Sequence, residues 1–376
     1  MASKFRVANA LAFTKDLAMS FTWFYLSLYL ISTGFSGLEI GVLLSLLTLT
    51  ALFASFPAGM LNDRFGTSRP LVFGFLLTAA FYTGLYLFTG FWELVFFFFL
   101  GGLGLNIARV SINNILFKSD IEKKAGILFG KLNMWEHFGV AAGFFAGGFM
   151  LMFMEFSAVF LLSAVVFALI AVLSFFAGEG RRDRFPVIEY RGELLKGEVL
   201  FFLVVLFLYT LHWGAEITSY APFLETVLNL NLFQTGLYMS IPVIFLAFSA
   251  YFTGKAADSG RNLKKMLIFG LLLSGATHIL MTFPVLEFSF LMRILHEIGD
   301  AMVIVLSFVL ISRIFSIERR GGTSGFVMNT MILGQFAGAV VFGALGASMG
   351  YAFPLYVSGL LEILAAFLAL LFLKNR

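Results

Sequence analysis

Twelve long apolar stretches constrain the fold of this 376-residue chain more than any other feature of its sequence. A helix that crosses the hydrocarbon core of a bilayer needs roughly 20 mostly apolar residues. Stretches of this kind lie near residues 8–32, 38–61, 70–88, 91–116, 126–152, 156–177, 199–224, 232–255, 264–283, 286–313, 322–349 and 352–373. We therefore predict an all-α membrane protein with twelve transmembrane helices.

The composition supports lipid as the main solvent of the chain. Hydrophobic residues make up 60% of it and charged residues 12%, against about 45–50% and about 25% in soluble domains. There is no cysteine, which excludes disulfides, thiolate metal sites and thiol nucleophiles. The four histidines are scattered without a metal-ligand spacing, so we predict no metal, no cofactor and no catalytic residue.

The positions of the basic residues predict the orientation. If the N-terminus is cytoplasmic, every lysine and arginine except Lys15, Arg109 and Arg293 falls on the cytoplasmic side. The opposite turns carry only glutamates, and a loop bias of this kind sets topology. We expect a multi-pass protein of the plasma or inner membrane, with both termini cytoplasmic. The net charge of +4 is explained by these loops, so no nucleic-acid partner is predicted.

Two groups of residues recur 195 positions further along the chain. The first group is Gly41, Ser45, Gly59 and Asp63, which recurs as Gly236, Ser240, Gly254 and Asp258. The second group is Gly130, Gly139, Gly143 and Gly148, which recurs as Gly325, Gly334, Gly338 and Gly343. The sequence therefore predicts two related six-helix bundles, residues 1–178 and 199–376, joined by a polar cytoplasmic linker over 179–198.

The loop after the second stretch carries a family signature. It contains Gly59, Asp63, Arg64, Gly66 and Arg69 in the order GxLxDRxGxxR, and so resembles the major facilitator superfamily. A degraded copy contains Gly254, Asp258, Gly260 and Arg261. The fifth stretch, with Gly130, Gly139, Gly143, Gly147 and Gly148, is similar to the antiporter-associated motif of that family, although Phe144 replaces its proline.

The resemblance covers essentially the whole chain and implies a transporter in which two bundles rock about a site between them. It further implies that Asp63, Arg64, Arg69, Asp120 and Asp258 belong to a conformational latch with the loop glycines. The glycines of the fifth and eleventh stretches, including Gly334 and Gly338, would let neighbouring helices pack closely.

Ionisable residues inside apolar stretches are costly and are functional candidates by default. Asp16, Ser20, Trp23 and Ser27 share one face of the first predicted helix. Asn106, Arg109 and Asn113 share a face of the fourth, where Arg109 either snorkels or lines a cavity. Glu136 and His137 lie near the middle of the fifth, and Glu136 is our first candidate for a proton-coupling carboxylate.

The second half carries two further polar groups. The seventh predicted helix places Tyr209, His212, Trp213, Glu216 and Tyr220 on one stripe. The tenth carries Arg293 and Glu297, which we expect to neutralise each other, and His296 and Asp300, which share the same spacing. A histidine beside a carboxylate titrates near neutral pH, which favours proton coupling. Glu362 in the last helix is predicted to have a packing or interfacial role.

These features favour a monomeric, proton-coupled secondary transporter of a small, partly hydrophobic solute. Efflux by antiport is favoured over uptake by symport, and sodium is the alternative coupling ion. A non-transporting receptor or scaffold remains a different class of function. An enzyme would need a nucleophile, a ligand set or a phosphate-binding loop, and none of these is visible in the sequence.

Overall fold

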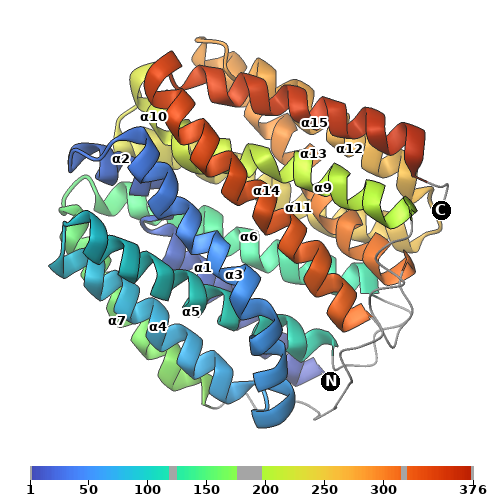
Figure 1. Cartoon of the computed structure of the whole chain (residues 1–376), viewed down its shortest axis with the longest axis horizontal. Coiled ribbons are helices and arrows are strands. Elements are labelled where there is room, and N and C mark those ends of the chain that lie inside the picture. The colour runs from blue at the N-terminus through green and yellow to red at the C-terminus, as the bar shows by residue number, and fades with distance from the viewer. Residues whose placement is uncertain (1, 118–124, 176–196, 315–319, 374–376) are drawn as a thin grey trace.

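The computed structural model describes residues 2–117, 125–175, 197–314 and 320–373. Its helices run in one general direction, and α1 begins at the same end of the bundle at which α15 ends (Figure 1). We call this end the terminal end and the other the distal end. The helices are α1 (Ala2–Ser20), η1 (Trp23–Tyr25), α2 (Leu26–Ser32), α3 (Gly37–Phe65), α4 (Ser68–Leu87), α5 (Phe91–Phe117), α6 (Ala125–Met150), α7 (Phe156–Ser174), α9 (Gly197–Ala215), η3 (Glu216–Tyr220), α10 (Ala221–Thr226), α11 (Leu232–Asp258), α12 (Leu263–Leu280), α13 (Leu286–Ile314), α14 (Arg320–Met349) and α15 (Ala352–Phe372).

The helices form twelve membrane-crossing stretches in two groups, as the sequence predicts. Among the described residues, ten helical stretches are long and apolar enough to span a bilayer. The other two are α1 with its continuation η1 and α2, and α6, which carry more polar residues and lie within the same bundle. The predicted linker lies outside the described residues, apart from its last two positions at the start of α9.

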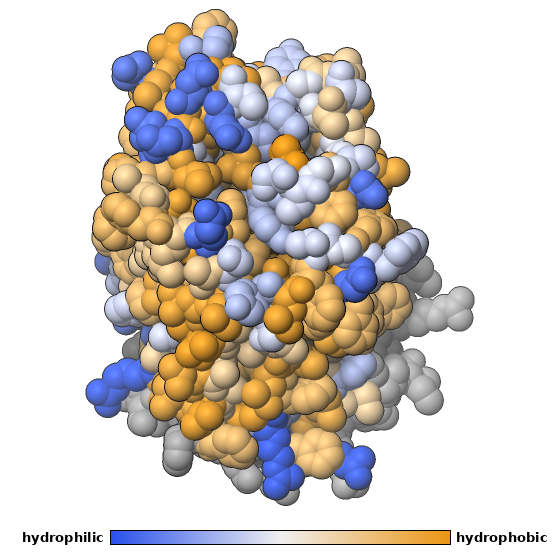
Figure 2. Space-filling view, turned by 90° about the vertical axis from the view of Figure 1, so that its left-hand side faces the viewer, coloured by the Kyte–Doolittle hydropathy of each residue, from blue (hydrophilic) through white to orange (hydrophobic). Residues whose placement is uncertain are grey.

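Apolar side chains cover most of the face seen from the left of Figure 1, and hydrophilic ones gather mainly in the upper part of that view (Figure 2). Many large exposed side chains are apolar, including Phe53, Trp92, Phe153 and Leu371. A soluble protein rarely exposes so much contiguous apolar surface, whereas lipid solvates it without penalty.

The two copies of the repeat begin their second helices in the same way. Ser36 caps α3 in a reciprocal box with Glu39, and Asn231 caps α11 in the same box with Gln234. Each box satisfies backbone amides that the first helical turn would otherwise leave unpaired. The two caps are 195 residues apart, the offset of the glycine landmarks.

The same repeat makes the contacts between the two halves at the distal end. A Cβ on Gly148 of α6 would lie 3.2 Å from the Cα of Gly236 of α11. A Cβ on Gly343 of α14 would lie 3.2 Å from the Cα of Gly41 of α3. Glycine removes side chains from each surface, so the helix backbones touch. The two glycine pairs are related by the repeat. The Tyr25 hydroxyl also crosses the interface and donates a hydrogen bond to the carbonyl oxygen of Leu232 at 3.4 Å. Together these contacts close the distal end.

The other motif glycines pack helices within each half. Gly139 and Gly143 of α6 lie against the backbone of α1, at Phe13 and Leu17, and Gly147 lies against Phe21, just after the end of α1. In the second half, Gly334 and Gly338 of α14 lie in the same way against Phe207 and Leu211 of α9. Gly130, at the terminal end of α6, instead faces Ala250 of α11 across the interface.

Both leading helices are irregular where they approach each other. The helix that begins with α1 changes to a 3-10 turn at η1, and the helix that begins with α9 widens to a π-helical turn at η3. Phe24 of η1 meets Tyr220 of η3 edge-on, with ring centroids 6.0 Å apart. Because of the 3-10 turn, the face predicted to join Asp16, Ser20, Trp23 and Ser27 does not continue as one regular stripe.

The distal seal predicts the effect of adding volume at Gly41. A Cβ there would lie 2.7 Å from the carbonyl oxygen of Ala339, so Gly41→Val should force α3 and α14 apart. Because the chain has no native cysteine, spin labels on cysteines introduced at the exposed positions Leu38 and Ser348 can report this separation. We expect a longer mean distance in the valine variant. Gly59→Val in the same helix, where nothing lies within 4 Å, is the control, and equal distances in both variants would disprove the seal.

Candidate functional site

A buried group of charged side chains lies inside the second half of the protein. We call it the histidine–carboxylate cluster and define it by its titratable members. Five helical elements supply them: α9 (His212), η3 (Glu216), α12 (His278), α13 (Arg293, His296, Glu297 and Asp300) and α15 (Glu362). Their side chains are between 0% and 6% exposed except that of Glu216, at 16%.

Arg293 is the cation on which one side of the cluster depends. Its guanidinium forms a very short ion pair with Glu216 and a second one with Glu297 at 2.6 Å. The guanidinium carbon also lies 4.6 Å from the centre of the Tyr220 ring, on which it stacks. The planar guanidinium suits this arrangement, because it can pair with two carboxylates while its face rests on an aromatic ring.

His212 joins the other two carboxylates. Its Nε2 lies 3.4 Å from Asp300 Oδ1, and its Nδ1 lies 3.2 Å from Glu362 Oε1 and 2.5 Å from the carbonyl oxygen of Tyr209. The indole N–H of Trp213 donates to the other oxygen of Asp300 at 3.2 Å. An imidazole between two carboxylates is well placed to exchange a proton with either of them.

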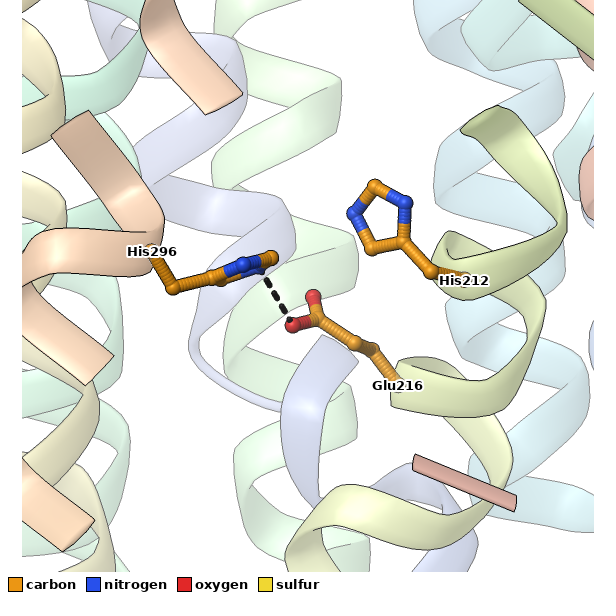
Figure 3. Close-up of side chains that lie close together, drawn as sticks. All are labelled: His212, Glu216 and His296. Carbon is orange, nitrogen blue, oxygen red and sulfur yellow. Dashed lines mark ion pairs between the residues drawn. The ribbon is translucent and has the colours of Figure 1, made fainter. Parts of the chain in front are cut away.

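A serine hydroxyl links the two sides of the cluster. The Ser274 hydroxyl lies 3.0 Å from Asp300 Oδ1, 2.5 Å from Glu362 Oε2 and 3.1 Å from His296 Nδ1. The Nε2 of His296 lies 3.3 Å from Glu216, and both side chains point toward the space beside His212 (Figure 3). A hydroxyl has one proton and can serve one of these acceptors at a time, so the network has alternative hydrogen-bond arrangements.

Several buried atoms of the cluster have no hydrogen-bond partner. Within the part of the chain that the structure describes, these atoms are His212 Nε2, His278 Nδ1, Arg293 Nε, His296 Nε2 and Glu362 Oε1. Buried polar atoms are normally satisfied, and each exception needs an explanation. Apart from Arg293 Nε, each of them lies 3.2–3.8 Å from a group of opposite potential charge, so these contacts are electrostatic and not well-aligned hydrogen bonds.

The donor atoms also fall into three groups that could hold a metal ion by distance alone. These groups are His212, Glu216 and His296; His278, His296 and Glu362; and His212, Asp300 and Glu362. The paired Arg293 lies against the first group, and its positive charge would repel a second cation there. In the other two groups Ser274 already binds the carboxylates. The arrangement therefore fits a hydrogen-bonded proton network better than a metal centre.

The first half contains a smaller polar group. Lys15 pairs with Asp16 at 2.6 Å, and both side chains are buried. The Lys15 side chain therefore stays inside the protein. Glu136 of α6 is close enough to Asp16, Lys15 and Arg109 to interact with their charges. His137 is half-buried, and its Nδ1 lies 2.7 Å from the carbonyl oxygen of Asn133.

The remaining predicted cavity residues have varied environments. Asn106 is buried, and its amide donates to the carbonyl oxygens of Gly102 and Leu47, so it joins α5 to α3 instead of facing a cavity. Arg109 is exposed, Asn113 and Trp23 are half-buried, and Tyr209 is fully buried with its hydroxyl 3.5 Å from Asp300 O.

Two features of the cluster were not expected from the sequence. Glu362 does not have a peripheral packing role, since it is fully buried and contacts His212 and Ser274. His296 lies 3.3 Å from Glu216, and the Ser274 hydroxyl links it to Asp300. His278, which the sequence reading left out, contacts Glu216 at 3.8 Å and Ser358 at 3.1 Å.

The latch residues are only partly described. Arg64 and Arg69 are exposed, and Gly66 ends α3 with a φ of +79°, a conformation that favours glycine. The side chain of Asp63 and all of Asp120 lie outside the described residues. Asp258 accepts a hydrogen bond from the backbone N–H of Ile127 at 3.0 Å, which joins the terminal ends of α11 and α6 across the two halves.

Sequence comparison identifies the family. The family model of the Major Facilitator Superfamily matches residues 9–264 and 259–376, so the chain belongs to that superfamily. Its members are transporters, and this chain is a secondary transporter of small molecules and not an enzyme. No curated protein matches the sequence.

Solved transporters share the fold along nearly the whole chain. The human organic anion transporter MFSD10 (TETRAN) is 14% identical, with a TM-score of 0.72 over 97% of this chain and 98% of that one. A bacterial homologue of the human lysosomal transporter Spinster, inward-facing and unoccupied, is 13% identical, with a TM-score of 0.78 over 98% and 96%. A mutant of the nucleoside transporter NupG is 14% identical, with a TM-score of 0.76 over 99% and 100%. Identities this low establish the fold alone.

The ion pairs of Arg293 predict a large stability effect. Arg293→Gln leaves Glu216 and Glu297 buried without their cation, which should cost about 3–5 kcal/mol. Removing one carboxylate at the same time should restore part of this loss, so Arg293→Gln/Glu216→Gln should be more stable than Arg293→Gln. Thermal unfolding of the purified variants in detergent measures the difference. A double variant no more stable than Arg293→Gln would contradict the pairing.

Proposed function

We propose that the protein is a proton-coupled transporter in which the histidine–carboxylate cluster binds and releases the coupling protons. One observation supports this proposal most strongly. The cluster contains four carboxyl groups, Glu216, Glu297, Asp300 and Glu362, but one permanent cation, Arg293. Three further positive charges are needed for neutrality, and the three histidines and the carboxyl groups themselves can supply them by binding protons.

Membrane burial makes this charge balance demanding. An unpaired ion in a low-dielectric interior costs several kcal/mol even after relaxation. The other titratable groups that face the cluster are Tyr209, Tyr220, Tyr238 and His137, none of which carries a permanent positive charge. A change in the number of bound protons must therefore be accompanied by a rearrangement or by the binding of a charged solute.

A physical route connects the cluster to the contact between the halves. Glu216 pairs with Arg293, Arg293 stacks on Tyr220, and Tyr220 meets Phe24 of the first half. Glu216 and Tyr220 begin and end η3, where the wider helical turn can tighten to a regular one. Protonation of Glu216 would weaken its hold on Arg293 and so loosen the aromatic contact between the two halves.

We propose that the solute binds between the halves, with Trp213, His137, Glu136 and Arg109 among its contacts. The aromatic and charged groups suit a small, partly hydrophobic solute. We favour proton antiport with efflux, because the glycines of α6 resemble the antiporter-associated motif of the family. Symport is the alternative direction, and sodium the alternative ion. The basic loops favour cytoplasmic termini in a plasma or inner membrane.

The first experiment finds a solute and then separates coupling from binding. Thermal-shift screening at two pH values, with organic anions, nucleosides, sugars, amino acids and drugs as probes, identifies a stabilising compound. Transport of that compound is then measured in proteoliposomes, both under an imposed pH gradient and as gradient-free exchange. Glu362→Gln should lose at least about tenfold of the gradient-driven flux yet keep exchange, because exchange needs no net proton movement.

Matched variants decide which carboxylate carries the proton. Glu287→Gln, the same substitution at an exposed glutamate of α13, should leave both fluxes unchanged. Glu136→Gln tests the first half in the same assay. Loss of driven flux in Glu136→Gln alone would move the coupling site to the first half. Unchanged driven flux in both variants would refute proton coupling by either carboxylate.

The direction of coupling has its own test. In inverted membrane vesicles, an antiporter that expels its solute should accumulate it when the vesicle interior is made acidic, since protons leaving the vesicle exchange for entering solute. A symporter should instead accumulate it when the exterior is acidic. Uptake with the external pH lowered would overturn the antiport assignment.

A further inference from the structure

A second candidate site lies on the outer surface of the second half, toward the terminal end. A pocket of about 450 Å³ opens between α11, α12 and α13. It is lined by Ser249, Phe252, Thr253 and Ala256 of α11, by Arg261 in the following turn, by Lys265, Met266 and Phe269 of α12, and by Met302 of α13. None of these residues belongs to the histidine–carboxylate cluster.

The mouth of the pocket carries two exposed cations. Arg261 and Lys265 are both exposed, and among the described residues neither makes an ion pair. The nearby carboxylate of Asp258 instead accepts the backbone N–H of Ile127. The two basic side chains flank the start of α12, where the helix dipole adds further positive potential. This end of the pocket favours a ligand with a negative charge.

The rest of the pocket is apolar and faces the surface that the lipid chains cover. Phe252 and Phe269 are 60% and 58% exposed, and Met266, Met302 and Ala256 form the walls between them. Of the two hydroxyl residues at its base, Ser249 donates to the carbonyl oxygen of Ile298, so that hydroxyl is already satisfied. A ligand that fits must be charged at one end and apolar along its length.

We propose that this pocket binds an anionic phospholipid, with the phosphate between Arg261 and Lys265 and one acyl chain along Phe252, Met266, Phe269 and Met302. Basic pockets between transmembrane helices bind anionic headgroups in this way. Zwitterionic lipid has no net charge to complement the two cations. Free phosphate would match the cations but leave the apolar walls uncovered.

The site also lies next to a contact between the two halves. Arg261 is three residues from Asp258, whose carboxylate holds the start of α6 through Ile127. A lipid phosphate on Arg261 would keep that arginine away from Asp258 and so leave the carboxylate available for the contact. Bound anionic lipid would therefore favour the state with the terminal ends of α6 and α11 together.

Lipid binding can be tested on the full-length protein in detergent. Native mass spectrometry with phosphatidylglycerol or phosphatidylcholine added in turn measures binding without a transport substrate. Wild-type protein should prefer phosphatidylglycerol. Arg261→Ala/Lys265→Ala should bind it about 30-fold more weakly, from a contribution of about 1 kcal/mol for each basic residue. Equal affinity for the two lipids in wild-type protein would overturn the proposal, whatever the variants do.

Two further variants make the test specific. Lys264→Ala removes a neighbouring cation that does not line the pocket, and it should retain wild-type affinity. Ala256→Phe keeps both cations but fills the apolar slot, and it should lower phosphatidylglycerol binding at least about fivefold. If Lys264→Ala lost as much phosphatidylglycerol affinity as the double variant, the lipid would be attracted to the basic loops in general and not to this pocket. Unchanged binding in Ala256→Phe, or displacement of the lipid by inorganic phosphate alone, would show that no acyl chain occupies the slot.

Discussion

The fold of the second half has to accommodate four carboxyl groups and one arginine inside a membrane. Arg293 neutralises part of this charge through Glu216 and Glu297, and the histidines border the rest. Buried ion pairs seldom add stability over a well-packed apolar core, and removing one partner is very costly. An apolar replacement would be the simpler way to build four packed helices. Ionisable groups buried in a membrane protein mark functional sites by default, and this cluster gathers eight of them in one place.

The position of the cluster explains how a small change in charge can reach the interface between the halves. It borders η3, whose wider turn lies opposite the 3-10 turn of η1 in the other half, and the two meet through Tyr220 and Phe24. The close glycine pairs at Gly41 and Gly343, and at Gly148 and Gly236, make the distal contact a packed surface that either fits or separates. Packed interfaces of this kind have discrete states, which is what alternating access requires.

The sequence predicted those parts of the structure that depend on local pattern. The apolar stretches predicted the helices to within a few residues, except at the start of α1, and the offset of 195 predicted related halves with close glycine packing. That two of these glycine pairs meet across the interface was visible only in the structure. The Arg293–Glu297 ion pair followed from i,i+4 spacing within one helix. The contacts of Glu362 and His278 were not predicted, because neither has a second ionisable residue one helical turn away, and only tertiary packing brings them to His212 and Glu216. The signal that could have found them is simply their presence in an apolar span, since such residues are seldom placed there without a partner.

Coupling is tested most directly by measuring protons and solute together. Proteoliposomes that contain the wild-type protein and a pH-sensitive dye are prepared without a pH gradient. Their internal pH should change as soon as a gradient of the transported solute is applied. If the cluster carries the protons, this change accompanies solute flux in wild-type protein and disappears in Asp300→Asn. Solute flux of normal size in wild-type protein with no movement of protons would contradict a proton-binding cluster.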